Sequence, residues 1–565
     1  MTTGSPLWFG PEDERTFGWL HTPTDGRALG AVLLCAPFGY EYICAYHAYR
    51  VLATLLADAG LVALRFDYHG TGDATGTSSD PDRIGACLRS IEHARNELAA
   101  RTDAPISAIG MRVGALLACT SAATAQPFQQ LVLWDPSTSG RAFIKEMQLL
   151  RMIGMGIPDE ARTDGSFESA GVDYTPETVA ALKDLDIAKL SGRLASEVLV
   201  VARPGREPAT KAMATIEQGA DAVDRIPALG QEQLIDVVSA HSVVPATTLA
   251  AMVAWLRDHA GHETHAITAP GTTERRAVVG RTDDGRAVVE EALFIGDLDL
   301  FAITTEPEDG GHGPWIIGLN NSTDHHIGPN RMWVDLARDL AQSGCRFARI
   351  DLSGIGDSGV RPDQQAHRSY APEAFEDVKT IAAFLEDRDP HDVVLVGLCS
   401  GAYLGVDVGA MFGVRRVIAI NPMLDYVPPD VLGGATTPRA APSGHWWTRL
   451  FSGSKTTERL GKMIPPIGWT VLDRLGLHPS PARGVRRVVA RDVDTVLIYG
   501  DDEVLAKLQQ RARSDLRTLE RSPAFHMHVI PGMDHALMLT KPRRELHDLL
   551  VNQITEHIAV GSPGS

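Results

Sequence analysis

The sequence lacks an excess of positive charge, a long apolar run and paired cysteines. Its 53 Lys and Arg are outnumbered by 71 Asp and Glu, a net charge of -18. This argues against a nucleic-acid partner, because phosphate binding needs concentrated Lys and Arg. With no 18-residue apolar run and no charged-then-apolar leader, we expect neither membrane insertion nor export. The six cysteines are scattered without a Cys-x-x-Cys pair, which suits a reducing cytoplasm.

An internal repeat predicts the architecture. Residues 31–73 align without a gap on residues 315–357, at an offset of 284. Asp67 then meets Asp351, and the Gly-Asp pair at 72–73 meets a second Gly-Asp pair. Copies of roughly 270 residues are too large to be solenoid units, so each should form a separate α/β domain.

The repeat also places the domain boundaries. A chain of 565 residues is too long for one ordinary core. We predict a first domain at 1–258, a linker at 259–274 and a second domain at 275–565. The linker is rich in His, Thr, Gly and Pro and has no apolar period.

The second copy contains a Gly-x-nucleophile-x-Gly turn. Residues 397–401 read Gly-Leu-Cys-Ser-Gly and follow an apolar, strand-like run at 393–396. Such a turn lifts a nucleophile off the end of a sheet strand, and its glycines let helix and strand approach closely. Cys399 occupies the central position and is predicted to be the nucleophile, with Ser400 as the competing candidate. We expect the helix N-terminus and a neighbouring imidazole to lower the pKa of the thiol toward neutrality.

An acid and a histidine follow at suitable places. A strand-like run at 494–499 leads into three adjacent carboxylates, of which we favour Asp502, then Asp501, then Glu503. A further strand is followed by a Gly-containing loop that ends at His535. The order nucleophile, acid, histidine is that of the α/β-hydrolases. The three groups are therefore predicted to form a triad in which His535 shares the thiol proton.

A tetrahedral intermediate also needs backbone donors for its oxyanion. One should be the amide of Ser400, the residue after the nucleophile, and the other an amide of Asn321 or Ser322 in the loop after the strand at 315–318. Residues 324–326 of that loop read Asp-His-His, but no further His or Cys cluster has metal-ligand spacing. We therefore expect neither a metal nor another cofactor.

The first copy has the same glycine-containing turn as the second but lacks its reactive groups. Its turn at 110–114 carries Arg112 where the second copy has cysteine, and arginine cannot act as the nucleophile. At the acid position the sequence continues with Arg203 and Arg206. The first domain is therefore predicted to be catalytically degenerate and kept for packing. Alternatively, Arg112, Arg203 and Arg206 converge as an anion site for the phosphate of a pantetheine arm or the acidic helix of a carrier protein.

A Pro-rich interval in the second copy, at about 422–490, interrupts the alternation of strands and helices and is predicted to form a lid. Three of its aromatic residues are Trp446, Trp447 and Trp469. Aromatic and aliphatic density of this kind can line an acyl-binding cleft, and it can equally be the ordinary core of a lid. Both interpretations stay open.

These motifs carry a family resemblance over nearly the whole chain. Each half resembles the serine-aminopeptidase-like branch of the α/β-hydrolases, through residues 66–73 in the first half and through residues 397–402, Asp502 and residues 532–535 in the second. The resemblance implies two tandem α/β-hydrolase domains, the first degenerate and the second with a lid insertion. Most members of that branch use serine. Cys399 is similar instead to the nucleophile of enzymes that move acyl groups between thiols, including acyl and aminoacyl transferases that act on carrier proteins.

The chemistry of cysteine gives a reason for the exchange. A thiolate that attacks a thioester makes another thioester of similar energy, so the acyl group can be passed on. We therefore predict an acyl-thioester enzyme that transfers, cyclises or releases an acyl group bound to coenzyme A or to a phosphopantetheinyl carrier protein. The alternatives are a simple ester or thioester hydrolase, and a non-catalytic binding protein.

Overall fold

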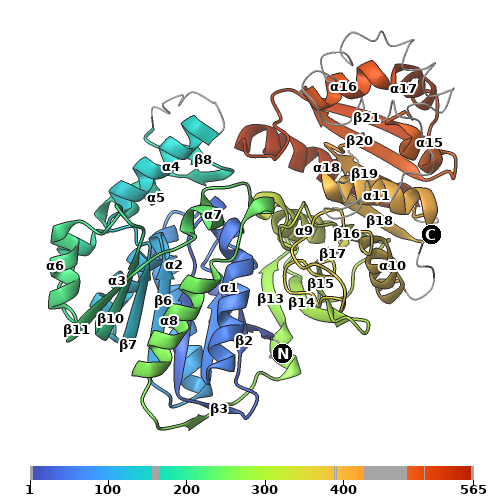
Figure 1. Cartoon of the computed structure of the whole chain (residues 1–565). Helices are drawn as coiled ribbons and strands as arrows, with labels where there is room; N and C mark the ends of the chain where they lie inside the picture. Colours follow the sequence, from blue (N-terminus) through green and yellow to red (C-terminus); the bar gives the residue numbers. More distant parts are fainter. Residues whose placement is uncertain are drawn as a thin grey trace.

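The protein forms two α/β halves that lie side by side (Figure 1). The computed structural model describes residues 4–154, 164–386, 389, 391–424, 480–501 and 503–561. Within these ranges, every helix is too short or too polar to cross a membrane.

The first half contains an eight-stranded sheet that is antiparallel at one edge and parallel beyond it. Its strands in spatial order are β1 (Ser5–Phe9), β2 (Thr16–His21), β5 (Leu61–Phe66), β4 (Gly30–Cys35), β6 (Ile106–Met111), β7 (Phe128–Trp134), β10 (Ala195–Ala202) and β11 (Ala222–Pro227). The helices of this half are α1 (Tyr40–Asp58), α2 (Arg83–Arg101), α3 (Val113–Thr124), α4 (Gly140–Gly154), α5 (Pro176–Asp184), α6 (Thr210–Gln218), α7 (Gln231–Ile235) and α8 (Ala246–His259). A small hairpin of β8 (Phe167–Ser169) and β9 (Val172–Tyr174) follows α4.

The second half contains a nine-stranded sheet. Its strands in spatial order are β13 (Arg276–Arg281), β14 (Ala287–Ile295), β15 (Leu300–Pro307), β17 (Arg346–Ile350), β16 (Trp315–Gly318), β18 (Val393–Leu398), β19 (Arg416–Ile420), β20 (Asp494–Gly500) and β21 (Phe525–Ile530). Its described helices are α9 (Met332–Gln342), α10 (Ala374–Leu385), α11 (Ser400–Met411), α15 (Arg483–Val489), α16 (Glu503–Arg511), α17 (Arg513–Leu519) and α18 (Thr540–Gly561).

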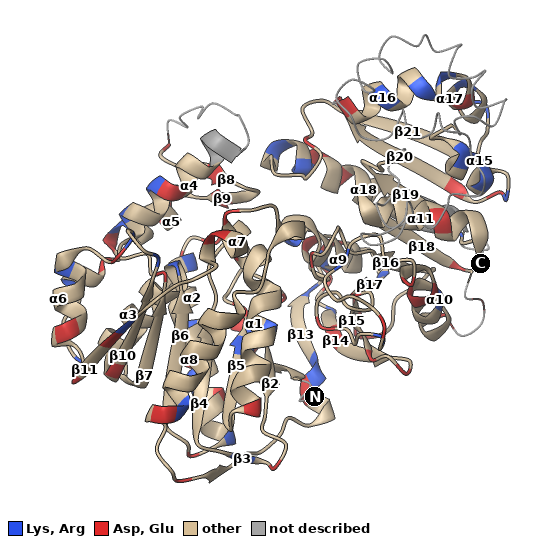
Figure 2. Cartoon of the chain, viewed as in Figure 1, with Lys and Arg blue, Asp and Glu red and all other residues tan. Residues whose placement is uncertain are grey.

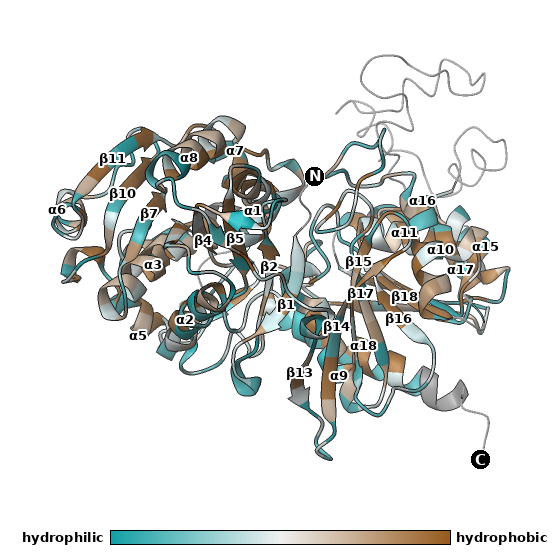
Figure 3. Ribbon diagram, turned by 90° about the horizontal axis from the view of Figure 1, so that it is seen from below, coloured by the Kyte–Doolittle hydropathy of each residue, from teal (hydrophilic) through white to brown (hydrophobic). Residues whose placement is uncertain are grey.

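The central strands of the second sheet consist mainly of apolar residues, and much of their ribbon is brown in Figure 3. Val393 and Leu395 of β18 belong to one core cluster, which includes residues of α10, α11 and α15 to α17. Val394 and Val396 point the other way, into a cluster with residues of α9 and α18. Such two-sided burial is typical of a parallel sheet covered by helices on both faces.

The two sheets have the same strand order once the additional edge strand β13 is set aside. β4, β5 and β6 of the first half occupy the places of β16, β17 and β18 of the second. The α/β fold class, with two sheet regions, is confirmed by this topology.

The predicted linker, 259–274, is not a free tether. Its strand β12 (His265–Ala266) pairs antiparallel with β3 (Arg27–Ala28) of the first half. The boundaries proposed at 258 and 275 stay a prediction. The lid proposed at 422–490 lies largely at 425–479, outside the described residues.

The two halves meet first through an aromatic cluster at their antiparallel edges. Trp19 of β2 contacts the rings of Phe294 and Phe301, with ring centroids 6.1 and 4.8 Å apart. Trp8 and Phe17 belong to the same buried cluster. This junction is hydrophobic and desolvated, as in a stable subunit interface.

Beside the aromatic cluster lie two reciprocal ion pairs. Arg65 of β5 binds Asp357 of the second half at 2.6 Å, and Arg349 of β17 binds Asp73 of the first half. The offset of 284 superimposes Arg65 on Arg349 and Asp73 on Asp357. The halves therefore dock on each other through equivalent surfaces, in the manner of an isologous dimer interface.

Candidate active site

Cys399 lies at the tight turn between β18 and α11. Its backbone has φ 52° and ψ -108°, a conformation that non-glycine residues rarely adopt. A Cβ atom added to Gly397 would come within 2.4 Å of the carbonyl carbon of Gly401, and one added to Gly401 within 2.6 Å of the carbonyl oxygen of Asn320. Both glycines of the motif are thus required by close backbone packing, which holds the strained cysteine in place.

The thiol of Cys399 is half-buried and has two local hydrogen-bonding groups. The Tyr370 hydroxyl lies 3.7 Å from Sγ, and the backbone amide of Ser400, at the N-terminus of α11, also reaches the sulfur. Burial raises the pKa of the thiol, and the carboxylate of Asp324 raises it further, whereas Tyr370 and the Ser400 amide lower it. Our expectation of a lowered pKa is therefore wrong, because desolvation outweighs the helix terminus. A thiol whose pKa is raised carries little thiolate at neutral pH.

His535 lies on the loop between β21 and α18, and its neighbour Asp534 fixes the shape of that loop. The Asp534 carboxylate accepts hydrogen bonds from three backbone amides, those of Ala536, Met538 and Leu539, at 2.9 to 3.1 Å. Asp534 is therefore a structural acid, held by the loop that presents the imidazole. Cys399 packs against the same apolar cluster that contains Met533 and Leu537, on either side of His535.

Asn421, at the end of β19, joins the histidine loop to the strand that precedes the candidate acids. Its Nδ2 donates to the carbonyl oxygens of Asp534 and His535, both at 3.3 Å, and its Oδ1 accepts from the amide of Gly500 at 3.1 Å. The side chain is fully buried. Sequence reasoning missed this role. The available signal was a polar Asn-Pro pair directly after a buried strand, and Asn tolerates the positive φ of 45° found here.

The three candidate acids have different positions. Asp501 accepts a 2.7 Å hydrogen bond from the amide of Gly532 and so ties the loop after β20 to the histidine loop. Glu503 is the first residue of α16. Asp502 lies outside the described residues, as do Trp446, Trp447 and Trp469 of the proposed lid. The choice of Asp502 and the role of the three tryptophans stay predictions.

The loop after β16 lies over the candidate nucleophile. The Ser322 amide donates to Ser400 Oγ at 2.7 Å, and Asn321 Nδ2 donates to Asp324 at 3.2 Å. The hydroxyl of Ser400, the competing nucleophile, is thus buried and already an acceptor from the loop. Of the predicted oxyanion donors, the amide of Ser322 therefore already donates a hydrogen bond within the protein.

The first half reaches into this loop. Asp324 accepts a hydrogen bond from Ser239 at 2.9 Å, and burial raises the pKa of Asp324 to about 6. His326 is fully buried between Asp351 and Asp73 of the first half, each 2.8 Å away. Attraction to both aspartates raises the pKa of His326 to about 10 despite its burial. The run at 324–326 is therefore part of the junction between the halves, and no set of three metal-binding side chains is found in the described part of the chain.

In the first half Arg112 occupies the matching turn, with φ 56° and ψ -122°. Its guanidinium binds Glu41 at 2.9 Å and Glu146, and lies 3.5 Å from Asp135. Three carboxylates surround one buried cation, so Arg112 has no charge to spare for a ligand.

The other two arginines of the proposed basic cluster are likewise paired. Arg203 binds Asp135 at 2.7 Å and Asp236 at 2.6 Å, and Arg206 lies 3.9 Å from Glu146. The interpretation of Arg112, Arg203 and Arg206 as an anion site is therefore wrong, because local carboxylates neutralise all three.

Comparisons with known proteins found similar solved structures and a matching family model. The chain is similar to an esterase of Pyrococcus furiosus at 14% identity, covering 48% of this chain and 91% of that one with a TM-score of 0.31. A proline iminopeptidase of Mycobacterium smegmatis is similar at 15% identity, 48% and 100% coverage and a TM-score of 0.30. The thioesterase domain from the curacin biosynthetic pathway is similar at 15% identity, covering 47% of this chain and 99% of that one, with a TM-score of 0.28. No curated protein matches the sequence. Residues 311–549 match the model of the α/β hydrolase family, and with the strand order above this match establishes the α/β-hydrolase fold.

Proposed function

We propose that the second half catalyses acyl transfer from thioesters, with Cys399 as the covalent nucleophile. The observation that carries the proposal is the strained turn at Cys399, which puts a thiol beside the N-terminal amide of α11. Strained backbone of this kind is concentrated at functional sites. The matching turn of the first half has the same strained backbone with Arg112 at its centre, so the reactive thiol is what distinguishes the second half.

The proposed reaction has two stages, both at Cys399. His535 takes the proton of the Cys399 thiol as sulfur bonds to the acyl carbon of the substrate thioester, giving a tetrahedral oxyanion. The amide of Ser400 and one amide of the loop at 319–323 stabilise that oxyanion. The bond from carbon to the leaving sulfur then breaks, His535 returns the proton to the leaving thiolate, and an acyl-cysteine remains.

An acceptor completes the cycle. An amine, alcohol, thiol or water attacks the acyl-cysteine while His535 removes its proton, the Cys399 sulfur leaves, and His535 returns that proton to the sulfur. The raised pKa of the thiol supports the need for His535, because without a base little thiolate is present at neutral pH. Asp502 is proposed as the group that orients His535, with Asp501 as second choice. A coenzyme A or carrier-protein thioester is proposed as the donor.

Among oxyanion donors, the geometry favours Asn321 over Ser322 in the resting conformation. Ser322 donates to Ser400 Oγ at 2.7 Å and would have to release that bond to reach an oxyanion. Ser400→Ala removes this acceptor without touching the thiol. It therefore separates a supporting role of Ser400 from a nucleophilic one.

The test follows thiol release from a panel of acyl-coenzyme A thioesters, with and without an amine acceptor. Cys399→Ala and His535→Ala should each lower turnover by several orders of magnitude, whereas Ser400→Ala should retain most of it. Amide product in the presence of the amine indicates transfer, and free acid alone indicates the simple hydrolase. Turnover that survives Cys399→Ala but is lost in Ser400→Ala would contradict the proposal. Wild-type inertness toward all acyl thioesters and esters would favour the non-catalytic alternative.

A further inference from the structure

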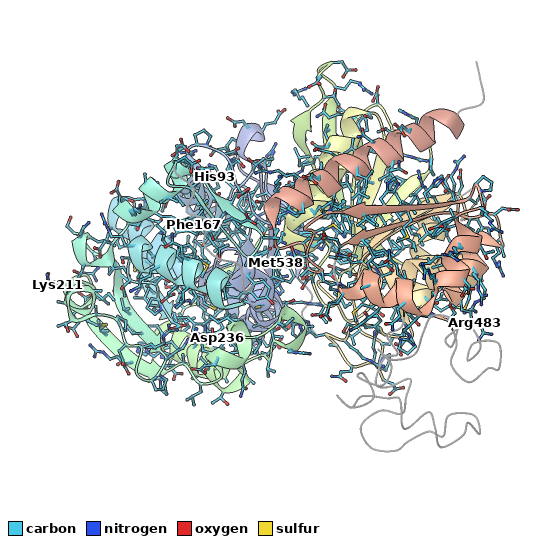
Figure 4. The ribbon with its side chains drawn as sticks, turned by 90° about the horizontal axis from the view of Figure 1, so that it is seen from above. His93, Phe167, Lys211, Asp236, Arg483 and Met538 are labelled. Atoms are coloured by element: carbon cyan, nitrogen blue, oxygen red, sulfur yellow. The ribbon has the colours of Figure 1, made fainter. Side chains whose placement is uncertain are left out.

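Two segments of the first half contact the two loops of the second half that are proposed to carry the reaction. One is the short helical turn Ser239–His241, between α7 and α8, and the other is the β8–β9 hairpin. They contact the oxyanion loop, residues 319–324, and the histidine loop, residues 531–539. Figure 4 labels Met538 of the histidine loop at the junction between the halves.

Ser239 reaches the oxyanion loop through Asp324. Its Oγ donates to one oxygen of the Asp324 carboxylate at 2.9 Å, and the other oxygen accepts from Asn321 Nδ2 at 3.2 Å. The amide of Asp324 donates in turn to the carbonyl oxygen of Asn321 at 2.9 Å. The hydroxyl of Tyr40, the first residue of α1, accepts from the amide of Ser239 at 2.8 Å and so fixes the donor. Asn321, the favoured oxyanion donor, is therefore tied to the first half through a single carboxylate.

The ionisation of Asp324 depends on this contact. Burial raises the pKa of Asp324 to about 6, and the hydrogen bonds from Ser239 and Asn321 oppose the shift. Removing the Ser239 hydroxyl would therefore favour the protonated carboxyl. Hydrogen bonds to an ionised acceptor are stronger than those to a neutral one, so Asn321 would be held less firmly.

The β8–β9 hairpin anchors the end of the histidine loop. Glu168 of β8 accepts a hydrogen bond from the amide of Thr540, the first residue of α18, at 2.7 Å. That amide has no acceptor within its own helix, and the helix dipole favours a carboxylate there. Both residues are buried, so little water competes for the contact. Figure 2 shows the basic start of α18 beside this hairpin.

A second contact joins the hairpin to the loop itself. Arg543 donates to the carbonyl oxygen of Gly171, in the hairpin turn, at 2.7 Å and to that of Leu537 at 3.0 Å. Asn330 Nδ2 also donates to the Leu537 carbonyl at 3.0 Å, and a Cβ atom added to Gly171 would lie 2.2 Å from the Asn330 side chain. Leu537, close after His535 in the loop, is thus fixed by two side chains that both contact the first half.

We propose that the first half positions both reactive loops of the second, with Ser239 holding the oxyanion loop and Glu168 the histidine loop. This positioning role rests on the proposed function, because it serves a reaction at Cys399. In the second half, the connection from the last strand to the last helix carries His535, and the matching connection of the first half carries Ser239. The first half is then required for turnover although the bonds form and break in the second.

The test measures kcat and KM for an acyl-coenzyme A thioester, and the rate of alkylation of Cys399 by iodoacetamide, in variants of the full chain. Ser239→Ala should lower kcat about tenfold or more with little change in KM, because a misplacement of about 1 Å can cost ~10²-fold in rate. Its alkylation rate should not fall, since alkylation forms no oxyanion. Glu168→Ala should lower kcat likewise and also slow alkylation at neutral pH, because a displaced His535 no longer shares the thiol proton.

Conservative variants and a matched control separate positioning from folding. Ser239→Thr keeps the hydroxyl and Glu168→Gln keeps an acceptor oxygen, so both should recover most of the turnover. The control is Ser196→Ala, at another half-buried serine of the first half, whose Oγ accepts from Arg193 at 3.4 Å and which should turn over as wild type does. A loss in Ser196→Ala as large as that in Ser239→Ala, or no recovery in the conservative variants, would overturn the positioning role.

Hydrogen exchange tests the same role without turnover. Ser239→Ala should speed exchange in residues 319–324 and Glu168→Ala in residues 531–539, each without effect on the other loop. Unchanged exchange in both loops would overturn the role. Wild-type turnover in both alanine variants, in a chain that Cys399→Ala inactivates, would overturn it and leave the proposed function standing. Turnover retained in Cys399→Ala would instead contradict the proposed function, and the exchange rates would still decide whether the first half holds the loops.

Discussion

Replacing Asp73 by asparagine tests how strongly the first half supports the second. Asp73 accepts from His326 at 2.8 Å and pairs with Arg349, and both partners are fully buried. The carboxylate is itself only 2% exposed. Breaking a buried ion pair from one side costs about 3 to 5 kcal/mol, because the other charge is left uncompensated.

The expected loss lies at the low end of that range. Arg349 keeps Glu290 at 2.8 Å, and His326 keeps Asp351, so neither cation becomes isolated. We expect Asp73→Asn to lower the free energy of unfolding by about 3 kcal/mol, measured by guanidinium denaturation. The control is Asp221→Asn, whose exposed carboxylate pairs with the exposed Arg193 and should cost less than about 1 kcal/mol. A loss from Asp73→Asn no larger than that of the control would refute the reasoning.

The same network predicts a dependence on pH. The folded pKa of His326 is raised from 6.5 to about 10, so its charge contributes fully below pH 6.5 and is lost as the pH rises through 10. The pKa of Asp73 is lowered, so its contribution is lost as the pH falls below 3.8. The stability difference between wild type and His326→Gln should therefore be largest between about pH 4 and 6.5 and shrink toward pH 10. A difference that grows with pH over that range would contradict a charged His326.

Three further predictions concern the candidate site and its counterpart. Arg112→Glu would place a fourth carboxylate beside Glu41 and Asp135. The free energy of unfolding of the first half, measured by denaturant titration, should therefore fall by about 3 kcal/mol or more. A variant as stable as wild type would contradict the ion pairs of Arg112. Tyr370→Phe should raise the thiol pKa, shifting the alkaline limb of the rate of Cys399 alkylation to higher pH; an unchanged profile would remove the tyrosine from the site. Asn421→Ala should lower kcat more than it changes KM, because it loosens the histidine loop without touching substrate, and a pure KM effect would argue against this positioning role.

Part of the fold could be predicted from the sequence because the repeat marks the same turns twice. Gly356 has a positive φ, and a Cβ there would lie 2.1 Å from Asp351. Gly72 stands in the same relation to Asp67. Steric requirements of this kind leave a readable pattern in one sequence. The Gly-x-Cys-x-Gly turn was predictable for the same reason.

The junction between the halves could not be predicted in the same way. Arg65 and Arg349 occupy equivalent places in apolar strands, and that anomaly was a signal of paired charges. The sequence did not reveal that each arginine binds the aspartate of the opposite half, because pairing depends on how the halves dock. The anion site proposed at Arg112 was wrong for a similar reason, because the carboxylates around Arg112 come from α1, α4 and the residue after β7, which only the fold brings together.

The central claim is that Cys399 carries the acyl group. The most direct test incubates the protein with an acyl thioester, quenches with acid and determines the intact mass, followed by peptide mapping of the adduct. The account predicts one acyl group per chain, on the peptide that contains Cys399, with none on Cys399→Ala and a normal adduct on Ser400→Ala. An adduct on Ser400, on any residue of 1–258, or at wild-type level in Cys399→Ala would contradict it.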